Sequence, residues 1–222
     1  MKVLAVETST LTGSVAIVDD TQVIAETTLS VSLQHSERLM PAIEELLRNA
    51  TIHLSEIDLF AVSQGPGSFT GLRIGVAAVQ GLALSQGKPV MGVSSLAALA
   101  RNGFFFKGLI VPILNAFRNE VYAGFYLSSE KSILESMVGD QVLSPTSLFE
   151  KLLQQNEKVL LLGNGVVVCQ EILKSLDPEK FCVAPAPFQN PRASHVAFLA
   201  LQQWERGEIQ SAVTPCYLRK AG

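Results

Sequence analysis

The sequence predicts an α/β protein of two lobes, each built on a mixed β-sheet flanked by helices. Apolar and β-branched runs typical of strands open each half of the chain, and runs with helical spacing follow them. The pattern restarts around residues 101–107, and a length of 222 residues suits two such lobes. We therefore expect an N-terminal lobe over 1–102, a C-terminal lobe over 103–190, and a closing helix and tail over 191–222.

The first half is expected to begin with an antiparallel meander and to continue with alternating strands and helices. Its predicted strands are 2–8, 14–19, 22–31, 59–63 and 89–93. A helix is predicted over 70–86, and Ser94 or Ser95 can cap a further helix. Another helix ends near Asn49, and Pro41 leaves two starts open. It begins near Met40 with Pro41 in its first turn, or Ser36 caps a helix that Pro41 bends.

The second half repeats the change from strands to strand–helix alternation. Its predicted strands are 108–114, 120–127, 158–162 and 181–183. Its predicted helices are 145–155, 166–176 and 193–206, the last one stopped by Gly207. A proline-rich linker covers 185–191, residues 129–143 carry no clear pattern, and the tail from Ser211 is irregular.

The charge content narrows the classes of function. Apolar residues make up 48% of the chain and charged residues 17%, below the usual fraction of about 25%. Either a large core lies under a neutral polar surface, or an apolar patch is buried against another subunit. The formal net charge of −3 provides no basic excess for a primary nucleic-acid-binding role, although a local patch stays open.

The cysteines indicate a reducing compartment. The chain has three cysteines, Cys169, Cys182 and Cys216, an odd number that leaves at least one without a disulfide partner in the chain. Their spacing matches neither a zinc site nor a redox pair. The opening MKVLAVETST lacks the apolar length of a signal peptide. We see no run of about 20 apolar residues. We expect a cytoplasmic protein with no membrane association.

Two segments could hold a phosphate group. Thr8 and Ser9 follow the first strand, where hydroxyls and backbone N–H groups can surround an anion. Gly65 and Gly67 lie in the loop QGPGSFTGLR between a strand and a helix, a common ligand position in α/β folds. The alternatives are an ordinary polar hairpin and a tight strand–helix crossover, since the loop matches neither GxGxxG nor GxxxxGK[ST].

The helix over 70–86 carries small residues among apolar ones, which fits either a core helix held tightly against the sheet or an oligomer interface. His35, His53 and His195 are scattered, and we expect them to be surface or capping residues. We find no metal ligand set, no GxSxG elbow and no catalytic residue.

Several segments together point to a known family. They are LAVETST, HSERLMP, QGPGSFTGLRIGVAAVQGLAL, VSSLAALA, Glu120-Val121-Tyr122 and Tyr217-Leu218-Arg219. They resemble the TsaB (YeaZ) family, most strongly over residues 1–100, and GPGSFTGLRIG is the most specific of them. The resemblance implies an actin/hexokinase/Hsp70-like fold. It also implies a non-catalytic scaffold or activator subunit for forming N6-threonylcarbamoyladenosine at position 37 of tRNA.

The resemblance further implies partners: a catalytic TsaD-like paralogue in a heterodimer, a TsaE-like ATPase, and a second copy of the chain when it is alone. tRNA is reached only through the complex. No metal or cofactor of its own is implied, and weak ATP or ADP binding at a lobe or subunit interface stays open. The interface helices lie near 36–50 and 70–86. The expected interface residues are Leu39, Ile43, Leu46, Arg73, Ile74, Ala78, Gly81 and Leu82.

The chain also departs from the family pattern. Asn115-Ala116-Phe117 stands where members often have Asp-Ala-Arg, and Glu7 stands where many have Asp. The alternative functions are an ATP-dependent small-molecule kinase and a peptidase of the same superfamily. A kinase of this fold is expected to carry an aspartate with a glycine-rich phosphate turn in both lobes, and Glu7-Thr8 and Asn115 do not match that pattern.

Overall fold

A computed structural model describes residues 1–20, 22–30, 35–128, 134–208, 210 and 212–218. The chain divides into two compact units, Met1–Ala98 with Arg192–Cys216 and Leu99–Pro191 with Tyr217–Gly222. The division lies a few residues before the expected restart at 101–107. The closing helix and most of the tail, predicted as a separate piece, belong to the first unit. No helix among the described residues is long and apolar enough to cross a membrane.

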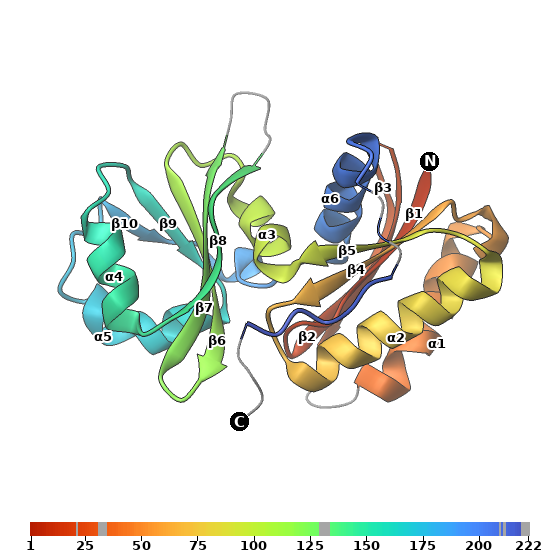
Figure 1. Ribbon diagram of the computed structural model, residues 1–222, viewed down its shortest axis with the longest axis horizontal. Helices are drawn as coiled ribbons and strands as arrows, with labels where there is room; N and C mark the ends of the chain where they lie inside the picture. The colour runs from red at the N-terminus through yellow and green to blue at the C-terminus, as the bar shows by residue number, and fades with distance from the viewer. Residues whose placement is uncertain (21, 31–34, 129–133, 209, 211, 219–222) are drawn as a thin grey trace. The chain divides into compact units, whose positions relative to one another are not determined.

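The first unit is built on a sheet with strand order β3-β2-β1-β4-β5 (Figure 1). Its strands are β1 (Lys2–Glu7), β2 (Thr12–Asp19), β3 (Gln22–Ser30), β4 (Leu59–Gly65) and β5 (Val90–Ser94). The first three form the predicted antiparallel meander. β4 pairs in parallel with β1, and β5 pairs in parallel with β4. The mixed sheet expected for this half of the chain is therefore present.

Both faces of this sheet are covered by helices. They are α1 (His35–Ala50), α2 (Phe69–Gln86) and α6 (Ala193–Glu205). Leu4 and Val6 of β1 pack with α1 and α2 in one core, whereas Val3 and Ala5 pack with α6 in another. Successive side chains of a strand point to opposite faces, so burial on both faces requires a continuous apolar run. This requirement explains why the first strand does not alternate.

The second unit repeats the same topology, with strand order β10-β9-β6-β7-β8. Its strands are β6 (Leu109–Phe117), β7 (Glu120–Ser128), β8 (Leu134–Leu143), β9 (Val159–Leu162) and β10 (Phe181–Val183). β6, β7 and β8 are antiparallel neighbours. β9 and β10 extend the sheet in parallel on the other side of β6. Much of the segment without a clear pattern is thus β8, while residues 129–133 lie outside the described part.

The helices differ from the sequence predictions mainly in their ends. The remaining elements are α3 (Ser95–Ala100), α4 (Pro145–Leu153), α5 (Gln170–Leu173), η1 (Leu54–Glu56), η2 (Arg101–Gly103), η3 (Asn164–Cys169) and η4 (Ala186–Phe188). The helix predicted over 166–176 is η3 followed by the short α5. α1 begins at His35, earlier than either predicted start, and Pro41 lies inside it. Pro41 is exposed, so the carbonyl that its missing N–H leaves unpaired can be solvated.

Candidate functional site

The end of β1 and the first turns of α2 are in close contact. A Cβ atom on Gly67 would collide with the Ser9 carbonyl, and one on Gly71 would collide with the Thr8 carbonyl. A Cβ on Gly75 would collide with the Thr8 hydroxyl. These three glycines therefore allow a helix to lie directly against a strand end. The tight strand–helix crossover, one of the alternatives for this loop, accounts for them.

The polar groups at this junction bond to one another. The Thr8 hydroxyl donates to the Gly71 carbonyl at 2.8 Å, and the Ser68 amide donates to the Ser9 carbonyl at 2.7 Å. The Ser9 amide donates to the Glu7 carboxyl, and the Ser68 hydroxyl accepts from the Gly71 amide at 3.3 Å. The structure thus brings Thr8, Ser9 and Gly67 together. The Thr8 hydroxyl and the Ser9 amide bond within the junction, whereas the Ser9 hydroxyl is buried without a hydrogen-bond partner among the described residues.

Gly65 has a different reason to be glycine. Its φ is 120°, a conformation that side chains disfavour, and a Cβ there would collide with the Cys216 carbonyl. The Cys216 amide donates to the Gln64 carbonyl at 2.6 Å. The tail therefore lies along the end of β4, where a ligand was considered from the sequence. The peptide bond from Gly65 to Pro66 is cis.

The tail is anchored at two further points. Val213 is 1% exposed and belongs to the core between the sheet and α1 and α2, and the Gln80 side chain donates to its carbonyl. Gln210 bonds to both backbone groups of Gly92. The sequence did not predict these residues, because the short Ala212-Val213 pair shows no helical or strand period. The proximity of Gln64 and Gly92 to the tail is visible only in three dimensions.

Glu7 is a fully buried carboxyl in the same region. Burial raises its pKa above the ordinary value, and hydrogen bonds from Ser9 and Ser63 offset only part of that shift. A raised pKa favours the protonated form, which suits an apolar site better than a carboxylate does. Among the described residues no group of three His, Cys, Asp or Glu side chains could hold a metal ion.

The predicted interface residues fall into two groups. Leu39, Ile43 and Leu46 are only 1–3% exposed and lie in the core beneath α1. These three side chains face the sheet and do not form a surface, because the apolar face of an amphipathic helix covers its own core first. The expectation that Leu39, Ile43 and Leu46 form a partner interface is therefore wrong.

The α2 residues reach the surface to different degrees. Arg73 and Gly81 are exposed, whereas Ile74, Ala78 and Leu82 are half-buried at the edge of the core. The Arg73 guanidinium lies 3.8 Å from the centre of the Phe69 ring, four residues before it on the same helix. Some of the interface residues predicted on α2 are therefore exposed, whereas those predicted on α1 are buried.

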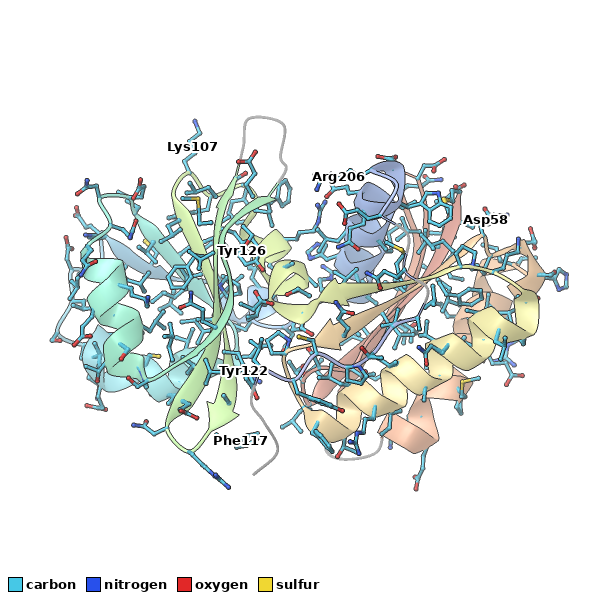
Figure 2. The ribbon with its side chains drawn as sticks, in the orientation of Figure 1. Asp58, Lys107, Phe117, Tyr122, Tyr126 and Arg206 are labelled. Atoms are coloured by element: carbon cyan, nitrogen blue, oxygen red, sulfur yellow. The ribbon has the colours of Figure 1, made fainter. Side chains whose placement is uncertain are left out.

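The β6–β7 hairpin holds the positions that depart from the family pattern. The Asn115 side chain accepts from the Phe117 amide at 2.8 Å, and the Asn115 amide donates to Asn164 at 2.9 Å. Phe117, Arg118 and Asn119 all have positive φ, between 52° and 60°. Figure 2 shows Phe117 at this turn, where it is 72% exposed. Asn115 thus shapes the turn instead of presenting an acid.

His53 and His195 each contact a group of the protein. The His53 amide donates to the Glu56 carboxylate at 2.8 Å, at the start of η1, and a ring nitrogen of His195 lies 3.2 Å from the Ala98 carbonyl. The side chain of His35 lies outside the described part of the structure. These contacts agree with capping and surface positions.

Comparison with known proteins identifies the family. A family model described as TsaD, tRNA N6-adenosine threonylcarbamoyltransferase, matches residues 22–219. The TsaB protein of Bacillus subtilis, named as a tRNA threonylcarbamoyladenosine biosynthesis protein, is 37% identical over 100% of this chain and 95% of its own. The solved structure of YeaZ from Pseudomonas aeruginosa is 28% identical, has a TM-score of 0.82, and matches over 98% of this chain and 99% of its own.

A more distant structure is informative about the fold alone. An inorganic polyphosphate/ATP-glucomannokinase from Arthrobacter has a TM-score of 0.52 at 11% identity, over 92% of this chain and 99% of its own. The expected actin/hexokinase/Hsp70-like fold class, with two mixed sheets flanked by helices, is confirmed. From its full-length similarity, the chain belongs to the TsaB (YeaZ) family and shares the domain of the TsaD model.

Proposed function

We propose that this chain is a non-catalytic subunit of the machinery that forms N6-threonylcarbamoyladenosine at position 37 of tRNA. In this role it pairs with a catalytic paralogue of the TsaD type. The name of its Bacillus subtilis relative supports the modification role. The observation that carries the non-catalytic role is the junction between β1 and α2. There, the Thr8 hydroxyl donates to the Gly71 carbonyl, the Gly71 amide donates to the Ser68 hydroxyl, and the Ser68 amide donates to the Ser9 carbonyl.

The outer face of α2 supports the pairing. Arg73, Ala77, Gly81 and Leu84 are exposed and spaced three or four residues apart, so they form one stripe along the helix. Leu84 is 84% exposed. An interior glycine costs a helix about 1 kcal/mol relative to alanine, yet a Cβ on Gly81 would meet nothing within 4 Å. A helix of another subunit lying close to this stripe would explain both features.

The remaining expectations belong to the same proposal. A TsaE-like ATPase completes the complex, the chain forms a homodimer when it is alone, and the complex works in the cytoplasm. Weak ATP or ADP binding at a lobe or subunit interface stays a prediction.

Reconstitution tests this proposal. The chain is mixed with a TsaD-type protein, a TsaE-type ATPase, tRNA and a threonylcarbamoyl donor, and modified nucleoside is measured with and without the chain. We expect modification to depend on the chain, and light scattering to detect a heterodimer at micromolar concentration. Equal modification without the chain contradicts the proposal. ATP hydrolysis by the chain alone at about 1 per second or faster would favour the kinase alternative.

A further inference from the structure

Three phenylalanine rings form an exposed cluster on the second unit, which we call the aromatic patch: Phe104, Phe105 and Phe188. The rings are 42%, 63% and 38% exposed, respectively. Phe105 meets Phe104 and Phe188 edge to face, with ring centroids 6.0 Å and 6.1 Å apart. Two of the three rings come from the segment after η2 and the third from η4, so the fold brings distant segments together here.

The backbone under the aromatic patch is held firmly. The Asn102 side chain is 5% exposed and donates to the carbonyls of Phe188 at 2.9 Å and Asn190 at 2.8 Å. The Ser128 hydroxyl donates to the Phe104 carbonyl at 2.6 Å. Gly103 lies so close to the sheet that a Cβ would collide with Leu160. The exposed rings are therefore attached to a rigid base and do not belong to a loose loop.

The two sequence segments that carry the aromatic patch together contain basic but no acidic residues. Residues 99–119 contain no Asp or Glu, and neither do residues 181–191, although the whole chain has 20 acidic residues. Lys107 is exposed and extends away from the ribbon (Figure 2). Arg101, the first residue of η2, is half-buried, and its Nε and Nη1 atoms are buried. The patch thus combines exposed aromatic rings with one exposed cation, Lys107, in a chain whose net charge is −3.

Unpaired RNA bases fit this combination best. Single-stranded nucleic acids bind where aromatic rings accept bases by stacking and cations meet the phosphates. An acidic surface would repel such a ligand, and the two segments lack acidic side chains. We propose that the aromatic patch stacks with unpaired bases of tRNA in the assembled complex, and that Lys107 meets the adjacent phosphate. This inference rests on the proposed function, because that function supplies the RNA.

The test measures tRNA binding to the complete complex assembled with wild-type or altered chain. Phe105→Ala removes the central ring, and the matched control Phe117→Ala removes a ring of comparable exposure on the β6–β7 hairpin. Stacking of one base on one ring corresponds to a change in affinity of about fivefold or more. We expect Phe105→Ala to weaken tRNA binding by at least that factor, Phe105→Trp to restore it, and Phe117→Ala to leave it unchanged.

Two further measurements separate RNA stacking from other contacts. Lys107→Gln should reduce the slope of log affinity against log salt by about one. A single-stranded oligonucleotide should compete with tRNA more strongly than a duplex of the same length, and Phe105→Ala should remove that preference.

The outcomes are distinct. Unchanged tRNA affinity in Phe105→Ala overturns the inference, even if the complex modifies tRNA normally. Weaker assembly of the Phe105→Ala protein with its partner in the absence of tRNA also overturns it, because the patch would then be a protein contact. By contrast, the proposed function is overturned if tRNA is modified equally well with and without the wild-type chain. That outcome is measured as the amount of modified nucleoside, whereas the stacking inference is measured as the change in tRNA affinity.

Discussion

The hydroxyl of Thr8 donates a 2.8 Å hydrogen bond to the carbonyl of Gly71, joining the end of β1 to the first turn of α2. The two residues are this close because Gly71 has no side chain: a Cβ there would collide with the Thr8 carbonyl. Glycine is therefore required at position 71 by this contact, whereas a Cβ at Gly81 on the same helix would meet no atom within 4 Å.

Gly71→Ala and Gly81→Ala should change stability in opposite directions. The first forces β1 and α2 apart and should lower the free energy of unfolding by about 2 kcal/mol or more. The second replaces an interior helical glycine whose Cβ would meet nothing, and should raise stability by up to about 1 kcal/mol. Urea denaturation of both variants checks this. Equal effects would show that the close contact at Gly71 is not needed.

Glu7→Gln should remove a pH dependence of stability. The folded-state pKa of Glu7 is raised by burial, so the folded protein holds a proton that the unfolded chain releases. Stability therefore falls as pH rises from the ordinary Glu pKa, about 4.3, towards the raised value. Glutamine can still accept the Ser9 amide hydrogen bond and cannot ionise. We expect its stability advantage over wild type to grow with pH in denaturation measured between pH 4.5 and 8.

Glu56→Gln provides the control of opposite sign. Its pKa is lowered, first by the hydrogen bond from the His53 amide and then by Lys2. Its contribution is therefore present above the ordinary pKa and is lost as the pH falls through the lowered one. Parallel pH profiles for the two variants would contradict a raised pKa for Glu7.

Val213→Ala tests the anchoring of the tail. Val213 is 1% exposed in the core of the first unit, so removing two methyl groups should lower the free energy of unfolding by about 2 kcal/mol. Thr214 is exposed, and Thr214→Ala serves as the control with little expected effect. Thermal or urea unfolding that is insensitive to Val213→Ala would place the tail outside the cooperative unit.

Leu84→Asp tests the stripe on α2. This side chain is 84% exposed, so a charge there should leave the fold intact, while a charge buried against a partner is costly. We expect at least a tenfold weaker association with a TsaD-type partner, measured by calorimetry. The control is Leu153→Asp on the second unit, where the leucine is 54% exposed. If both variants pair normally while circular dichroism is unchanged, the interface lies elsewhere.

Much of the fold could be predicted because its signals are local. The strand runs, the helix over 70–86 and the hairpin turns each follow from short-range periodicity and turn chemistry. Short-range periodicity could not predict which residues of α1 are available to a partner subunit. Periodicity identifies the apolar face of a helix, and in Leu39, Ile43 and Leu46 that face covers the core. On α2, Gly81 was among the expected interface residues and is exposed, whereas the exposed Leu84 was not expected there.

The candidate site shows the same limit. The sequence predicted that Thr8, Ser9, Gly65 and Gly67 lie near a turn, but it did not predict what fills the turn. The Ser9 carbonyl lies against Gly67, and the Cys216 carbonyl lies against Gly65. Which atoms use a glycine's missing side chain depends on segments far away along the chain. The aromatic patch is another such case, because Phe188 joins Phe105 only in the folded state.

The repeated strand order gives each position in one sheet a counterpart in the other. Gly65 is the last residue of β4 and Gly163 follows β9, the parallel neighbours of the two central strands, and their φ angles are 120° and 112°. At the ends of the central strands the residues differ, a buried Glu7 in one and a turn-forming Asn115 in the other. Such a pattern is what duplication of an ancestral half would leave. In that case the two halves have kept a glycine where the backbone conformation requires one. The polar residues at the ends of their central strands have diverged.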